Sequence, residues 1–223
     1  MKVNKKIMNK KKILKIKKKK KRSKLLKTKQ KAVKMSKKNS KKIQLTDLVV
    51  VTTNPGKVAK INEILGTSHK TSSLNIPEVQ SLDLDEVITQ KAKAAYQILK
   101  KPVLVTDVSL EIEGLNGLPG TFVKFFLETL GTEGTVDLLK GKSKKTKATD
   151  AIAIYDGKTL KIFKGSAEGK VAPKDRGKNG FGFDKVFISR GYTKTWAELD
   201  TKVKNKISHR AIALQKLKKY LKG

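Results

Sequence analysis

Two carboxylates stand where a fixed backbone can hold them against a metal ion. Asp107 follows the apolar run 103–105 after one residue, Thr106, and the run predicts a buried strand that holds this carboxylate at a sheet edge. Glu78 follows Pro77 in a segment that predicts a loop between two helices. Mg²⁺ takes hard oxygen ligands and keeps several waters for substrate phosphates, so this pair suits a magnesium site. Two ordinary surface acids are the alternative.

A polar turn, residues 52–57, follows the apolar run 48–51 and precedes a predicted helix that reaches Leu65 and stops at Gly66. A helix N-terminus presents backbone N–H groups and a positive dipole end to an anion, and Lys57 adds a charge there. The turn therefore predicts a phosphate site, with an ordinary connection as the alternative. The turn is not a Walker A loop, because it lacks the spaced glycines that precede Lys-Ser or Lys-Thr in that motif.

Aromatic and cationic residues near the C-terminus suit the recognition of a base. In Phe181–Asp184 an aromatic face lies beside a carboxylate, although core packing is the alternative for one of the two phenylalanines. His209 and Arg210 follow Ser208, the predicted N-cap of the last helix. Cations at a helix N-terminus oppose its dipole, which indicates a task other than stability.

The elements that position these residues alternate between strand and helix periodicity. Asp156-Gly157 between two alternating apolar runs predicts a hairpin. Further apolar stripes predict helices at 88–99, 123–130 and from 208 to about 220. The pattern favours an α/β fold with a mixed central sheet flanked by helices.

The charge divides the chain at Asp47. Residues 1–46 carry +22 of the formal +34 and contain no acid, which predicts a disordered Lys-rich arm before a domain at 47–223. The arm is either a solvated tail or a contact to nucleic acid, and in a eukaryotic or viral source it would suit a nuclear address. The absence of cysteine excludes disulfides and thiolate metal sites. With no apolar run long enough for a membrane span, a cytoplasmic protein is expected.

Six blocks in order make residues 47–223 resemble the inosine triphosphate pyrophosphatase family. They are Thr-Thr-Asn-Pro-Gly-Lys (52–57), Pro-Glu-Val-Gln (77–80), Val-Leu-Val-Thr-Asp (103–107), Gly-Leu-Pro-Gly (117–120), Phe-Gly-Phe-Asp (181–184) and Lys-Asn-Lys-Ile-Ser-His-Arg (204–210). The resemblance implies a two-lobed fold, a homodimer, and Mg²⁺-dependent hydrolysis of ITP, dITP and XTP to the monophosphate and pyrophosphate, with Mn²⁺ as a substitute metal.

The resemblance also assigns roles to individual residues. It implies Glu78 and Asp107 as metal ligands, with Asp107 also catalytic. It implies substrate contacts through Thr52, Thr53, Asn54, Gly56, Lys57, Lys91, Lys124, Phe181, Gly182, Phe183, Asp184, Lys204, His209 and Arg210. Arg210 can donate to the 6-oxo group of hypoxanthine or xanthine, and adenine would leave its amino group unpaired there.

The chain departs from the family pattern at Thr106, where the family has a second acid before Asp107. Thr106 can coordinate weakly or through water, and Ser109 can supply the hydroxyl that the family carries next to its acids. The substitution predicts weaker metal binding or slower turnover. It also keeps two alternatives open: a nucleotide-binding protein with attenuated hydrolysis, and a nucleic-acid-associated factor that acts through the basic arm.

Overall fold

The structure is a computed structural model, and it describes residue 43, residues 45–74 and residues 76–222. The predicted disordered arm falls outside these residues, except at its C-terminal end. There, Ile43 is buried in the same apolar cluster as Leu48, and Leu45–Asp47 forms a short 3-10 helix, η1. The core therefore begins upstream of the boundary that the charge pattern sets at Asp47.

The described strands form one mixed sheet in the order β2-β1-β3-β5-β6-β7, with β4 paired to β3. The neighbours β2, β1 and β3 are parallel, whereas all other pairs are antiparallel. The strands are β1 (Val49–Val51), β2 (Lys70–Ser72), β3 (Val103–Ile112), β4 (Pro119–Gly120), β5 (Lys145–Tyr155), β6 (Leu160–Val171) and β7 (Phe187–Ser189). The expected α/β fold with a mixed sheet is confirmed.

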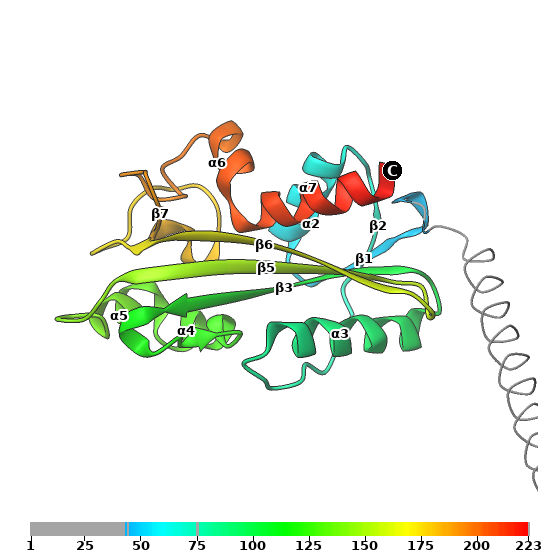
Figure 1. The fold of residues 1–223 in the computed structure, drawn as a ribbon, viewed down its shortest axis with the longest axis horizontal. Coiled ribbons are helices and arrows are strands. Elements are labelled where there is room, and N and C mark those ends of the chain that lie inside the picture. Colours follow the sequence, from blue (N-terminus) through cyan, green and yellow to red (C-terminus); the bar gives the residue numbers. More distant parts are fainter. Residues whose placement is uncertain (1–42, 44, 75, 223) are drawn as a thin grey trace, which may run out of the picture. The chain divides into compact units, whose positions relative to one another are not determined.

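Helices cover both faces of this sheet (Figure 1). Helix α3 (Leu84–Leu99) packs on β3 and β5, and α7 (His209–Lys222) packs on β6 and β5 from the other side, next to α2 (Pro55–Leu65). Near β7 and the far ends of β3 and β5 lie the short helices α4 (Val123–Thr129), α5 (Gly131–Asp137), α6 (Thr201–Ile207), η2 (Glu113–Leu115) and η3 (Gly182–Lys185). Among the described residues, no helix is long and apolar enough to cross a bilayer.

The buried apolar residues form three separate clusters. One cluster fills the space between the sheet and α2 and α7, and includes Leu104, Ile152 and Leu214. A second lies under α3, around Val105 and Ile88. A third surrounds Leu110, Phe187 and Trp196 at the other end of β3, β5 and β6.

Two sequence expectations need correction. Strand β3 does not end before Asp107 but continues to Ile112, because its whole length pairs with the long antiparallel strand β5. Helix α2 begins within the polar turn, at Pro55, since Asn54 caps it. Helix α6 has no counterpart in the expected elements. The hairpin at Asp156-Gly157 and the helices at 88–99 and 208–220 are confirmed.

Candidate functional site

The site lies where one side of β3 has no neighbouring strand. Strand β1 ends at Val51, opposite Val105, and β4 begins its pairing with β3 only at Leu110. A cavity of about 590 Å³ opens beside this interruption. Both faces of β3 contribute to the walls, and the predicted residues that line the cavity are Thr52, Thr53, Asn54, Lys57, Glu78, Lys91, Asp107, Lys124, Phe181, Gly182, Phe183, Asp184, His209 and Arg210.

The first turn of α2 forms one wall. The Oδ1 atom of Asn54 accepts a hydrogen bond from the backbone N–H of Lys57 at 3.1 Å, and Pro55 occupies the first turn, where its missing N–H costs nothing. Gly56 does not line the cavity itself. A Cβ atom at Gly56 would lie 2.9 Å from the ring of Phe181, so only glycine lets that ring approach the helix.

Lys57 is a buried cation at this wall. Burial, followed by the nearby charge of Arg210, lowers the pKa of Lys57 from 10.5 to about 8, although Asp107 and Asp150 act in the opposite direction. The ammonium group is therefore mainly charged at neutral pH and loses its charge in mildly basic solution.

Lys91 joins the two candidate metal ligands. Its Nζ atom lies 2.5 Å from Glu78 Oε1 and 2.8 Å from Asp107 Oδ2. Burial disfavours the charged form of Lys91, but the two carboxylates outweigh it, so the pKa of Lys91 is raised. The other oxygen of Asp107, Oδ1, accepts a hydrogen bond from the N–H of Val108 at 2.8 Å. Two segments far apart in the sequence thus converge on one cation.

This donor set fits a divalent ion in kind and in number. Glu78 and Asp107 supply hard oxygen ligands around one position that a cation, Lys91 Nζ, already occupies. Across the described part of the chain, no group of three or more His, Cys, Asp or Glu side chains could hold a metal. A site of two carboxylates suits an ion that completes its coordination with water and phosphate oxygens.

The two phenylalanines differ in their surroundings. Phe183 is 8% exposed and packs against Phe187, Trp196 and His209, so it is the one that belongs mainly to the core. Phe181 is 37% exposed, and the guanidinium carbon of Arg210 lies 5.1 Å from its ring centroid. Phe181 and Arg210 therefore present an aromatic face and a planar cation side by side in the cavity.

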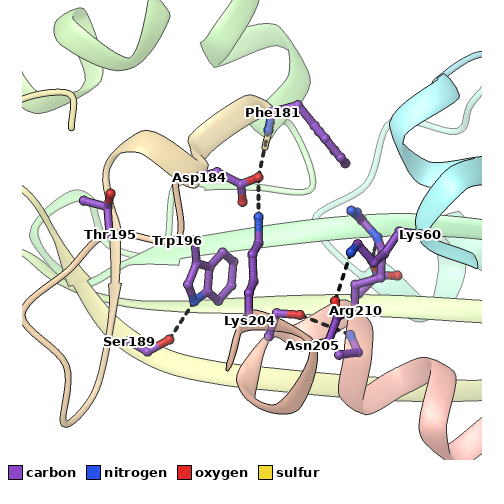
Figure 2. A network of polar contacts seen from close by, with 12 residues as sticks. Lys60, Phe181, Asp184, Ser189, Thr195, Trp196, Lys204, Asn205 and Arg210 are labelled. Atoms are coloured by element: carbon purple, nitrogen blue, oxygen red, sulfur yellow. Dashed lines mark hydrogen bonds and ion pairs between the residues drawn. The ribbon is translucent and has the colours of Figure 1, made fainter. Parts of the chain in front are cut away.

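The carboxylate of Asp184 holds the backbone at Phe181 through a hydrogen bond (Figure 2). Its Oδ2 atom accepts hydrogen bonds from the Phe181 N–H at 2.8 Å and from Lys204 Nζ at 2.7 Å. Lys204, expected to contact substrate, does not line the cavity but pairs with this carboxylate. Lys204 belongs to helix α6, and its contact with Asp184 joins α6 to η3.

His209 is held in the wall by stacking. Its ring lies parallel to that of Trp196, with centroids 4.9 Å apart, and the Trp196 indole N–H donates to Ser189 Oγ at 2.7 Å (Figure 2). Burial, followed by the charges of Arg210 and Lys204, lowers the pKa of His209 well below 6.5. The imidazole is therefore neutral at physiological pH. Ser208 Oγ caps the helix by accepting from the Ala211 N–H at 3.3 Å.

Arg210 forms a buried ion pair that the sequence analysis did not anticipate. Its Nε atom donates to Asp150 Oδ2 at 2.7 Å, and the Asp150 side chain is 0% exposed. Burial raises the pKa of Asp150, while Arg210 and Lys57 oppose that rise. A lone acid within the otherwise apolar and small run 148–154 is the signal that could have identified it, because carboxylates are rarely buried without a partner.

The comparisons with known proteins agree with this geometry. A sequence model described as the Ham1 family matches residues 48–220. An inosine triphosphate pyrophosphatase of Yarrowia lipolytica is 43% identical over 183 residues, 78% of this chain and 95% of that protein. A dITP/XTP pyrophosphatase of Thermococcus kodakarensis is 40% identical, covering 78% of this chain and 97% of that protein. The solved structure of a HAM1 protein from Coxiella burnetii superposes with a TM-score of 0.70 at 28% identity, over 80% and 99% of the two chains.

The chain belongs to the Ham1 family.

Within this Ham1 fold, Thr106 does not stand in for a metal ligand. Side chains alternate along a strand, so Thr106 shares the face of Leu104 and Ile152, opposite to Asp107. It is 2% exposed, and its hydroxyl has no hydrogen-bond partner among the described residues. Ser109 lies on the face of Asp107, but it donates to Glu111 at 3.4 Å and does not line the cavity.

A larger cavity, of about 830 Å³, is not the site. It lies at the end of β3 that contains Glu111 and Ile112, beside β7, and none of the predicted site residues lines it. Its charged lining residues mix both signs: Glu111, Glu113, Lys145, Lys147, Glu168, Lys170 and Arg190. Volume alone therefore does not identify the site of this Ham1 protein, whereas the convergence of lysines, carboxylates and an exposed aromatic ring does.

Proposed function

We propose that this Ham1 protein hydrolyses the non-standard purine nucleoside triphosphates ITP, dITP and XTP to the monophosphate and pyrophosphate, and so cleanses the nucleotide pool. The relatives named above for these activities support the proposal, since the chain covers nearly their whole length. The observation that carries it is the single cavity in which cations, paired carboxylates and the Phe181–Arg210 pair meet.

The triphosphate would lie against the first turn of α2. Thr52, Thr53 and Asn54 offer polar groups beside a helix N-terminus, which favours an anion. Lys57 and Lys124 would neutralise phosphate oxygens, one from a buried position and one from a side chain that is 69% exposed. Reactions at phosphorus need positioning and charge neutralisation more than covalent chemistry, and these residues supply both.

Hydrolysis would take place at the α-phosphorus, next to Asp107. We propose that Glu78 and Asp107 hold Mg²⁺, for which Mn²⁺ would substitute. A divalent ion in this position neutralises phosphate oxygens and makes a bound water more acidic. Asp107 would orient the attacking water and accept its proton. Its backbone is held rigidly because the pairing of β3 with β5 continues both before and after Asp107 along the strand. Lys91 would then stabilise the departing pyrophosphate.

The base would lie on Phe181, with Arg210 as the donor to its 6-oxo oxygen. The 5.1 Å spacing of guanidinium and ring brings both within reach of one planar ligand. Adenine carries an amino group at that position, so its complex would leave buried donors facing each other. His209 lines the same cavity, and its two buried ring nitrogens have no hydrogen-bond partner among the described residues.

Three wider features are proposed on the resemblance and the composition. They are a homodimer, a cytoplasmic location, and a non-specific contact of residues 1–46 with nucleic acid. Sedimentation of the full chain tests the dimer. A gel-shift titration tests the contact, which should weaken steeply as salt rises; binding that does not change with salt would contradict it.

The proposed reaction is tested by following oxygen from solvent into product. ITP hydrolysed in ¹⁸O-labelled water, with Mg²⁺, should give labelled IMP and unlabelled pyrophosphate, because attack occurs at the α-phosphorus. The D107N variant should fold and release pyrophosphate at least about a hundredfold more slowly. Release of inorganic phosphate with formation of IDP, or full activity in D107N, would refute the proposal.

A further inference from the structure

Asp150 is a fully buried carboxylate on the central strand β5, and the proposed reaction does not yet use it. Its side chain is 0% exposed, and the residues next to it along the strand are small or apolar. Burying an ionised carboxylate costs free energy unless charged or hydrogen-bonding partners compensate for the lost water.

Its contacts point to the cavity. Asp150 Oδ2 accepts from Arg210 Nε at 2.7 Å, and Asp150 also acts electrostatically on Lys57. Both cations line the cavity, but Asp150 does not. With Nε turned toward β5, the terminal nitrogens of the guanidinium remain for other partners. Asp150 therefore lies behind the two cations and offsets their mutual repulsion.

The backbone is shaped to permit this ion pair. Asp150 pairs across the sheet with Gly165 of β6. A Cβ atom at Gly165 would lie 2.2 Å from the carbonyl oxygen of His209 and 2.4 Å from the backbone nitrogen of Ala213. Glycine at this position lets the first turn of α7 lie directly on the sheet, where Arg210 reaches Asp150.

Asp150 and Thr106 share one face of the sheet. Thr106 pairs with Ile152 and Asp150 pairs with Val108, so the two polar residues are diagonal neighbours on adjacent antiparallel strands. Diagonal neighbours of this kind lie roughly 7–8 Å apart. Asp150 Oδ1 and Thr106 Oγ1 both lack a hydrogen-bond partner among the described residues. An acid at either position would therefore face the same buried region.

We propose that Asp150 is a positioning residue that orients Arg210 for recognition of the base, and that it supplies from β5 the buried negative charge that Thr106 does not supply from β3. This inference rests on the proposed function, since it assigns Arg210 to the 6-oxo group. It explains how the chain keeps a charged, ordered site although its β3 motif contains one acid where the family pattern has two.

The test compares D150N, the double variant T106D/D150N and the wild type, all as full chains. We expect D150N to lower the ratio of kcat/KM for ITP to that for ATP by about tenfold or more, because a misplaced Arg210 loses its bond to the 6-oxo oxygen. T106D/D150N should recover most of that ratio. Calorimetric titration with IMP and AMP in the absence of metal should show the same loss and recovery.

The control is T149V. Thr149 neighbours Asp150 on β5, bonds Ser166 Oγ at 3.0 Å and does not line the cavity. Its loss removes a hydrogen bond but no charge, so the ITP-to-ATP ratio should stay unchanged. An unchanged ratio in folded D150N would overturn the proposal. Should D150N fail to fold, the double variant decides: a folded double variant with a wild-type ratio supports the proposal, and one with a lowered ratio overturns it.

The proposed function and the positioning role of Asp150 can fail separately. A wild type that is inactive on ITP refutes the proposed function, while selective IMP binding that depends on Asp150 would still support the positioning role.

Discussion

Lys57 gives the site a pH dependence that belongs to a single side chain. Burial and Arg210 lower its pKa to about 8. In the proposed reaction the triphosphate would bind the charged form of Lys57. Protons leave this group as pH rises through 8, so we predict that kcat/KM for ITP falls between pH 8 and 9. In K57R the fall should disappear, because arginine stays charged throughout that range. Identical profiles for wild type and K57R would show that another group controls the fall.

Lys91 forms ion pairs with the two carboxylates that are proposed to hold the metal. Its removal in K91M leaves Glu78 and Asp107 with their charges facing one cavity, which favours a divalent cation. We predict that half-maximal activity is reached at a lower Mg²⁺ concentration, while kcat falls roughly tenfold or more because the departing pyrophosphate loses a cation. A Mg²⁺ titration of both enzymes measures the two effects. A higher Mg²⁺ requirement in K91M would contradict this role.

The contact between helix α7 and the sheet holds Arg210 in place. In G165A the added Cβ would press on backbone atoms of His209 and Ala213, which cannot yield as a flexible side chain would. We predict a loss of about 1–3 kcal/mol in the free energy of unfolding, together with a lower kcat/KM for ITP. Denaturant titration and kinetics measure both.

The matched control for G165A is G66A. Gly66 ends α2 with φ +74°, and a Cβ atom there would meet nothing within 4 Å. This variant should lose about 1 kcal/mol through backbone strain alone and keep its activity. If G165A and G66A behave alike in the assay, the close approach of α7 has no part in the site.

Much of the fold follows from local patterns, and the site follows only in part. The periodicity of 88–99, the stop at Gly66 and the Asp156-Gly157 turn act over a few residues, so the sequence predicts α2, α3 and the β5–β6 hairpin. The extension of β3 past Asp107 depends on pairing with β5, some forty residues later, and no local signal reports it.

The ion pairs of the site are similarly non-local. Motif residues indicate which side chains gather, but not that Lys91 lies between Glu78 and Asp107. Nor do they show that Asp150, absent from every motif, holds Arg210. Such contacts arise only when α3 and α7 have packed on opposite faces of the sheet, so sequence alone could not assign them.

Removal of the basic residues 1–42 should leave the rest of the chain folded, provided that Ile43 is kept. The charge of +22 lies within residues 1–42, whereas the Ile43 side chain is buried with Leu48 and Ile61. We predict that deletion of residues 1–42 leaves the unfolding temperature and ITP hydrolysis unchanged. Deletion of residues 1–46 should lower the unfolding temperature by about 5 °C, because it also removes the buried apolar contacts of the Ile43 side chain. Equal unfolding temperatures for the two truncations would count against a core that begins at Ile43.

The most direct test of the proposed pyrophosphatase activity is pyrophosphate release by the full chain across a panel of ITP, dITP, XTP, GTP and ATP, with and without Mg²⁺. We predict Mg²⁺-dependent release from the first three, with kcat/KM for ITP exceeding that for ATP by about a hundredfold, the discrimination expected of a buried donor that adenine cannot satisfy. Equal turnover of ITP and ATP, or no turnover of any nucleotide with Mg²⁺ present, would contradict it.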